Sequence, residues 1–180
     1  MIAAMVVTLA LLSDPGSRVD EFYCAHLPHA QSGLPDAERV AAIRDFLSDG
    51  LHAKLIAAIR YREEWRRRYP DEPSPDGGPP VIYKPPCVEG GDYFEGLSEW
   101  PDVFSPTEEP VQTFRIVRSE QADDAWRVRV AFRYETIPPV VWENTVIVIR
   151  ERDRYVIDDV LYEGDPAWRL SQRLIDCAKD

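Results

Sequence analysis

Two adjacent carboxylates near the end of the chain are the side chains best suited to proton transfer. Asp158 and Asp159 lie in a run of apolar and aromatic residues that predicts a β-strand. Neighbouring strand residues point to opposite faces of a sheet, so these two cannot form an acid–base pair with each other. One of them can face the interior, where burial favours the protonated carboxyl and suits it to proton transfer. The alternative is that both cap turns or pair with arginines.

Several aromatic residues are candidates to line a ligand pocket. Tyr134 and Trp142 belong to predicted strands, and Tyr93 follows a glycine pair and Asp92 in an irregular stretch. Small-ligand pockets are usually built from aromatic walls with few polar groups. The residues predicted to bind a ligand are Asp92, Tyr93, Tyr134, Trp142, Asp158 and Asp159. The alternatives are that Asp92 bonds local backbone amides and that the aromatic residues fill the core.

Cys24, His26 and His29 have the residue types of a metal site but not the geometry. Side chains two apart on a helix point about 200° apart, so Cys24 and His26 cannot share a metal there. A tetrahedral zinc site needs three or four converging ligands. The sequence also has no nucleophile elbow, phosphate-binding loop or dinucleotide fingerprint. We therefore predict no metal ligand, no catalytic residue and no cofactor.

Charge and composition restrict the class of protein and its partners. The 180 residues carry 21 Lys and Arg against 32 Asp and Glu, a net charge of -11. Such a surface repels phosphate backbones, so nucleic acid is not expected as a partner, whereas a basic partner would be attracted. A hydrophobic fraction of 44% is enough for a core, and the length suits a single domain over residues 15–180. Three cysteines, Cys24, Cys87 and Cys177, do not make a disulfide framework, and their pairing stays open.

Residues 1–14 form a candidate signal segment. Residues 2–12 are apolar apart from Thr8, and residues 13–16 end the run. The run is too short to span a membrane but has the length of a signal-peptide hydrophobic region. No basic residue precedes it and no small-residue cleavage site follows, so a buried helix or strand is the alternative. We expect a periplasmic or secreted protein whose mature chain begins after Leu12; otherwise it is cytoplasmic.

Three helices are predicted in the first half of the chain. Apolar residues at helical spacing predict a first helix over residues 15–27. Asp36 and Ser48 are suited to cap a second and a third helix. The third helix is expected to end at the basic residues 66–68, because cations favour the carbonyl end of a helix. The second helix is expected to bury the stripe Val40, Ile43 and Leu47.

Four strands are predicted in the second half. Residues 126–134 alternate between apolar and polar types, which indicates a half-buried strand. Segments at 111–118, 141–150 and 155–162 are joined to it by short links, so an antiparallel meander is expected. The last two segments are apolar on both faces. A final helix beginning at Asp165 and Pro166, or a second subunit, is therefore expected to cover the second face.

This order of elements resembles the nuclear transport factor two-like superfamily. Several stretches between about Val19 and Tyr162 are similar to a bacterial family of unknown function within it. They are Phe22-Tyr23, Gly33-Leu34-Pro35, Phe46-Leu47-Ser48, Gly91-Asp92-Tyr93-Phe94 and the stretch from Val156 to Tyr162. The resemblance implies an α+β fold in which N-terminal helices pack on a curved four-stranded antiparallel meander, the cone-shaped cystatin-like arrangement. It also implies export, and it supplies no established activity.

Two classes of function follow from these observations. We favour a non-enzymatic exported binding module for a small apolar ligand or a protein partner, because no acid–base pair is visible. One alternative is a lyase, isomerase or hydrolase that uses a pocket Asp, as some members of the wider superfamily do. Another is an immunity protein whose acidic surface would suit a basic toxin. A homodimer is a further option for the partner.

Overall fold

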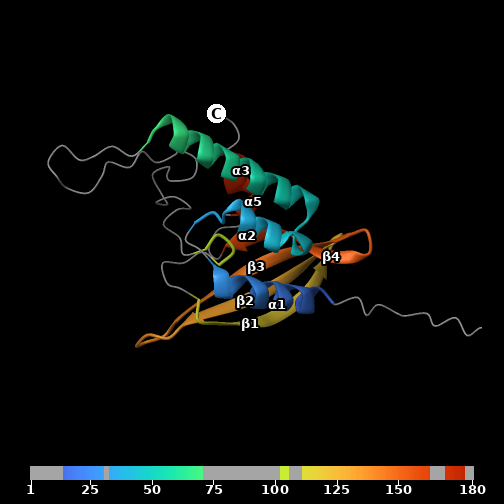
Figure 1. Ribbon diagram of the computed structural model, residues 1–180. Coiled ribbons are helices and arrows are strands. Elements are labelled where there is room, and N and C mark those ends of the chain that lie inside the picture. The colour runs from blue at the N-terminus through green and yellow to red at the C-terminus, as the bar shows by residue number, and fades with distance from the viewer. Residues whose placement is uncertain (1–13, 31–32, 71–101, 106–110, 163–168, 177–180) are drawn as a thin grey trace, which may run out of the picture.

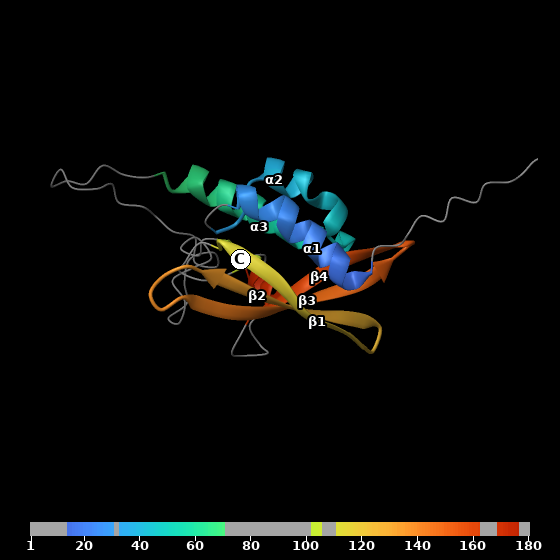
Figure 2. The same cartoon turned by 90° about the horizontal axis from the view of Figure 1, so that it is seen from below.

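The helices of the protein lie over one face of a four-stranded sheet (Figures 1 and 2). The computed structural model describes residues 14–30, 33–70, 102–105, 111–162 and 169–176. The helical elements are α1 (Pro15–His26), η1 (Leu27–His29), α2 (Ala37–Ala42), η2 (Arg44–Phe46), α3 (Asp49–Arg68) and α5 (Leu170–Asp176). The strands are β1 (Thr113–Ala122), β2 (Ala125–Tyr134), β3 (Val140–Glu151) and β4 (Arg154–Tyr162). The predicted α+β class is confirmed.

The sheet is an antiparallel meander in the order β1-β2-β3-β4, as the sequence predicts. Strand β1 starts and ends later than the predicted segment 111–118, because it pairs with β2 as far as Ala122 and Ala125. Asp123 in the link between these strands has φ 54, a left-handed conformation that short polar residues tolerate. Asp123 and Asp124 therefore form a tight two-residue turn between β1 and β2.

The alternation in β2 sets which face of the sheet meets the helices. Val128, Val130 and Phe132 are fully buried. Arg127, Arg129 and Arg133 on the opposite face are exposed. We call the buried side the inner face and the arginine side the outer face. The half-buried strand predicted from the alternation of residues 126–134 is confirmed, with Val130 on the buried side.

Capping residues begin the helices where the sequence predicts. Asp14 accepts from the backbone nitrogens of Gly16 and Ser17 at the start of α1. Asp36 accepts from the Arg39 nitrogen, and Ser48 accepts from the Leu51 nitrogen at the start of α3. Each cap satisfies a backbone N–H that has no partner inside its own helix.

The second helix is shorter than its apolar stripe suggests. α2 ends at Ala42, so Ile43 and Leu47 lie beyond it. Leu47 instead bridges to Ile157 in β4, and the Ser48 nitrogen donates to the Ile157 carbonyl at 2.8 Å. Both side chains are nevertheless buried in the core. Leu47 leaves the helical pattern because it pairs with a strand more than 100 residues away in the sequence. Helical spacing cannot reveal such a distant partner.

The last described helix joins the main core rather than the outer face. Leu170 and Leu174 belong to the same buried cluster as the residues of α3, and α5 contacts α3 and β4. The predicted start of this helix at Asp165 and Pro166 lies outside the described residues, as does the candidate signal segment through residue 13. No helix in the described part of the chain is long and apolar enough to cross a lipid bilayer.

Candidate ligand-binding site

An aromatic wall stands on the inner face where β2 and β3 pair. Phe132 lies directly opposite Trp142, and their rings stack at 5.6 Å with 23° between the planes. Phe132 is fully buried, and Tyr23 of α1 meets it edge-on at 5.1 Å. Trp142 is half-buried at the edge of this cluster. The wall is thus anchored in the core on one side and less covered on the other.

Asn144 interrupts this apolar wall. It lies two residues after Trp142 and is only 4% exposed. In the sheet it is paired with Val130 on one side and Tyr162 on the other. The Asn144 Nδ2 and the Trp142 Nε1 are both buried, and neither has a hydrogen-bond partner among the described residues. An unsatisfied buried donor costs about 1–3 kcal/mol, so two of them on one face of β3 destabilise the fold unless something accepts from them.

Residues 102–105 are fastened beside this wall by two tyrosines. The Tyr162 hydroxyl donates to the Val103 carbonyl at 3.1 Å, and the Tyr23 hydroxyl donates to the Phe104 carbonyl at 2.8 Å. Burial, reinforced by the charges of Asp159 and Asp102, raises the pKa of Tyr162 well above its ordinary value. Burial and Asp102 also raise the pKa of Tyr23. Both phenols therefore remain protonated donors, in surroundings of negative potential.

A buried polar network ties the same segment to α1. The Asp102 carboxylate meets His26 Nε2 at 2.8 Å through one oxygen and accepts from the Ser105 hydroxyl at 2.8 Å through the other. His26 stacks on Phe22 at 5.1 Å and is 1% exposed. The histidine and aspartate types could transfer protons, but both are enclosed by core side chains. The network serves to hold residues 102–105 in place.

The structure separates the residues with metal-ligating types. Cys24 and His29 are exposed, whereas His26 is buried against Asp102. Within the described ranges, no three His, Cys, Asp or Glu side chains gather closely enough to hold a metal ion. Cys24, His26 and His29 therefore do not converge on a common point where they could bind one metal ion.

Asp158 and Asp159 make separate sets of hydrogen bonds. A register shift pairs Ile147 with Asp159 and Val148 with Ile157, which leaves Asp158 as the extra residue of a bulge. Asp158 accepts from the Ser48 hydroxyl at 2.7 Å, at the start of α3. The buried Asp159 accepts from the nitrogens of Val160 and Ser171 and from the Ser171 hydroxyl. The carboxylates share no donor, and each fixes the start of a helix to β4.

The other predicted ligand residues are placed only in part. Tyr134 is half-buried at the end of β2, paired with Val140, and lies two residues beyond Phe132. Asp92 and Tyr93 lie outside the described residues. The structure therefore brings Trp142 to the inner wall near Tyr134, while Asp158 and Asp159 contact helix starts on the far side of β4.

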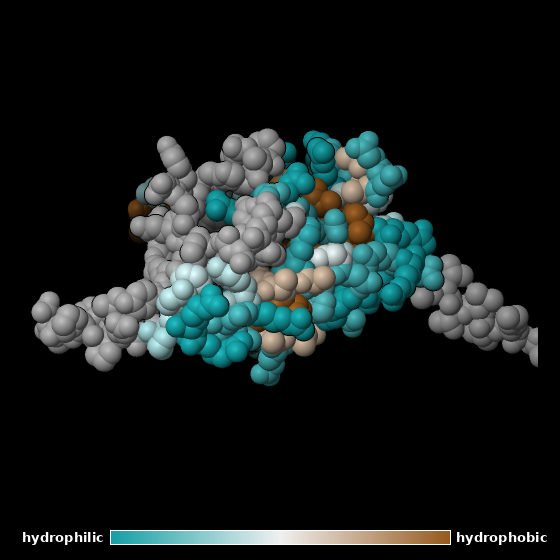
Figure 3. Space-filling model, turned by 90° about the horizontal axis from the view of Figure 1, so that it is seen from above, coloured by the Kyte–Doolittle hydropathy of each residue, from teal (hydrophilic) through white to brown (hydrophobic). Residues whose placement is uncertain are grey.

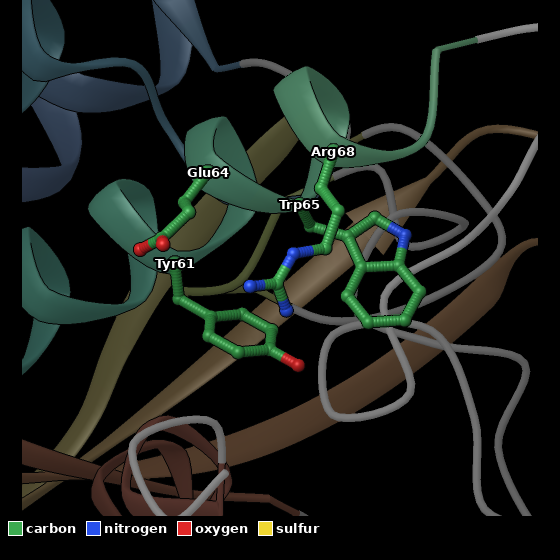
Figure 4. A pocket seen from close by; sticks show the side chains of 4 residues that line it. All are labelled: Tyr61, Glu64, Trp65 and Arg68. Carbon is green, nitrogen blue, oxygen red and sulfur yellow. The ribbon is translucent and has the colours of Figure 1, made fainter.

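Two surface depressions are found among the described residues. One, of about 240 Å³, is lined by Tyr61, Glu64, Trp65 and Arg68. All four come from one face of α3, and Figure 4 shows the Arg68 guanidinium between the two aromatic rings. The other, of about 160 Å³, lies where β1, β2 and β3 run side by side and reaches the wall residue Phe132; its lining is Thr113, Phe114, Arg115, Ala131, Phe132, Arg133 and Val141. Neither depression contains an unpartnered buried polar group among the described residues.

Sequence reasoning named Trp142 but missed Asn144 and Asp102. The sequence does contain a sign of Asn144, because it is the one amide in the inner-face series Trp142, Asn144, Val146 and Val148. A polar residue at a buried position of a regular strand is more informative than an apolar one. Asp102 left no such signal, since its partner His26 is 76 residues away. Comparison of the chain with protein-family models, with curated protein sequences and with solved structures found no match.

Proposed function

We propose that the protein is a non-enzymatic binding domain that holds a small, mainly apolar ligand against the inner wall at Trp142 and Asn144. One observation carries the proposal: the buried N–H donors of Trp142 and Asn144, two positions apart on the inner face of β3, lack an acceptor in the described structure. Aromatic surface with a few convergent polar groups is the usual composition of a small-molecule site. A bound molecule would cover the less buried edge of Trp142 and satisfy both donors.

Binding is better supported than catalysis by a pocket Asp. Asp159 already accepts three hydrogen bonds, and Asp158 accepts one at the bulge. Asp102 accepts from Ser105 and meets His26 within the core. A general base must reach its substrate with a free oxygen at about 2.6–3.2 Å. Asp159 and Asp102 each use both oxygens in structural contacts, and Asp158 is tied to Ser48, which favours a binding role.

We propose further that the domain has the cone-shaped fold of the nuclear transport factor two-like superfamily and is exported. Helices covering one face of an antiparallel meander support the first part, and the apolar segment at residues 2–12 supports the second. N-terminal sequencing of the protein from its host tests export: a mature chain starting after Leu12 is expected, and an intact Met1 in the soluble cytosol would contradict it. A protein partner, a basic toxin and a homodimer remain the rival uses of this domain.

Native mass spectrometry tests the proposed function directly. The full chain is purified without detergent, stripped of small molecules and exposed to an organic extract of its host. We expect a non-covalent adduct that Trp142→Phe weakens. Trp126→Phe is the matched control, because Trp126 is also half-buried on the inner face, where it pairs with Val148 at the other end of β2. An adduct insensitive to Trp142→Phe, or no adduct with the wild-type chain, contradicts the proposal.

A further inference from the structure

We propose that the ligand is a neutral molecule whose carbonyl oxygen accepts hydrogen bonds from both Trp142 Nε1 and Asn144 Nδ2. The inference deepens the proposed function and rests on it. The two residues share the inner face of β3, where positions two apart are separated by about 6–7 Å along the strand. Their side chains can therefore converge on one oxygen, and a carbonyl oxygen has two lone pairs to offer.

Among the described residues of the wall, the two unsatisfied polar groups are both donors, which selects among possible occupants. The Asn144 neighbours across the sheet are Val130, which is apolar, and Tyr162, whose hydroxyl donates to the Val103 carbonyl. A water molecule there could accept from both donors, but its own two hydrogens would face apolar surface. A buried water normally makes about three hydrogen bonds. A carbonyl has lone pairs and no hydrogen to satisfy, so it complements a wall of donors better than water does.

The electrostatic surroundings favour a neutral acceptor over a carboxylate. The charges of Asp159 and Asp102 help raise the pKa of Tyr162, and Tyr162 is the β4 residue paired with Asn144. The indole and amide donors are themselves neutral. The arginines of β2, such as Arg129, extend from the outer face and are exposed. An anionic ligand would thus lose its hydration beside two buried carboxylates, whose effect Arg173 offsets only in part.

Three probes of nearly the same shape test this inference. They are acetophenone, which carries a neutral carbonyl, α-methylstyrene, in which a methylene replaces the oxygen, and benzoate. Binding to the ¹⁵N-labelled full chain is followed through the indole N–H resonances, and Trp142→Phe identifies one of the five tryptophans. We expect acetophenone to bind about tenfold more tightly than α-methylstyrene and to move the Trp142 indole resonance downfield. Benzoate should bind more weakly than acetophenone.

Asn144→Leu separates the role of the donor from that of the apolar wall. Leucine has nearly the same size and no polar group, so this variant should still bind α-methylstyrene and lose the preference for acetophenone. Equal affinities for acetophenone and α-methylstyrene in the wild-type chain overturn the carbonyl inference and leave the proposed apolar site standing. Tighter binding of benzoate overturns the choice of a neutral ligand. Absence of binding by all three probes, together with no host-derived adduct, overturns the proposed function itself.

Discussion

At the scale of single residues, the buried polar groups of this protein divide into satisfied and unsatisfied ones. Asp159 is saturated by three donors, and Asp102 uses both oxygens. By contrast, the nitrogens of Trp142 and Asn144 are buried without an acceptor in the described structure. Satisfied groups of this kind stabilise a fold, whereas unsatisfied ones reduce stability unless a partner is present. The contrast is why we assign the carboxylates to structure and the two donors to binding.

Removing the Asp102 carboxylate tests its structural assignment. Asp102→Ala leaves His26 and Ser105 without their shared partner inside the core, so we expect it to lower the free energy of unfolding by about 3 kcal/mol or more. Ser105→Ala removes only one donor and should cost about 1 kcal/mol. Urea unfolding followed by circular dichroism measures both. Similar stabilities for Asp102→Ala and the wild type would show that the network does not fasten residues 102–105.

The hydroxyl of Ser48 makes two hydrogen bonds, one to α3 and one to β4. The Ser48 hydroxyl accepts from the Leu51 nitrogen and donates its own hydrogen to Asp158, so Ser48→Ala should remove the cap of α3 and its tie to the β4 bulge. We expect a loss of about 1–2 kcal/mol in thermal unfolding. Ser17→Ala is the control, because Ser17 is an exposed residue that bonds Asp14 locally. Equal losses in the two variants would contradict a special role for Ser48.

At the scale of elements, patterns that are local in sequence predicted the structure well. Asp36 and Ser48 cap helices as expected, and the alternation around Val130 gives the observed register. Long-range pairings were not accessible in this way. Leu47 leaves the helical pattern to meet Ile157, and the bulge at Asp158 depends on how β3 and β4 align. Periodicity reports which face a residue occupies within its own element but not which distant segment meets it.

The register of β2 predicts that substitutions at the neighbouring residues Val130 and Arg129 differ strongly in their effect on stability. Val130→Asp places a carboxylate at a fully buried position, at a cost of several kcal/mol that is comparable to the stability of a whole domain. Arg129→Asp changes a side chain that is 52% exposed and pairs with Glu143 only at 3.6 Å. We expect the first variant to be unfolded and the second to be folded, with a modest loss. Thermal melts of the two proteins decide, and matching melts would refute the register.

At the scale of the whole molecule, charge is distributed unevenly over an acidic chain. The net charge is -11, yet the outer face of β1 and β2 presents exposed arginines, among them Arg115, Arg127 and Arg129. The surface in Figure 3 is mostly hydrophilic among its coloured residues, with only small separate hydrophobic areas. The described residues visible in this view therefore form no broad apolar surface, which agrees with a site for a small ligand rather than a large partner.

The two buried tyrosines predict how the stability of the whole molecule depends on pH. The pKa values of Tyr23 and Tyr162 are raised in the folded protein by burial and by nearby carboxylates. In the unfolded chain these phenols lose their protons near pH 10, while the folded protein still holds them. The unfolded state then binds fewer protons, so the free energy of unfolding must fall as pH rises above about 10. Each tyrosine contributes a slope of up to about 1.4 kcal/mol per pH unit.

Urea unfolding at a series of pH values from about 8 to 11 measures this slope. The double variant Tyr23→Phe and Tyr162→Phe should be about 2 kcal/mol less stable at neutral pH, because each hydroxyl loses its bond to a carbonyl in residues 102–105. It should also lose most of the decline above pH 10, because phenylalanine has no proton to release. Tyr69→Phe, at an exposed position on the end of α3, is the control and should keep the wild-type slope. A double variant that declines as steeply as the wild type would show that other groups, and not these two phenols, limit stability at alkaline pH.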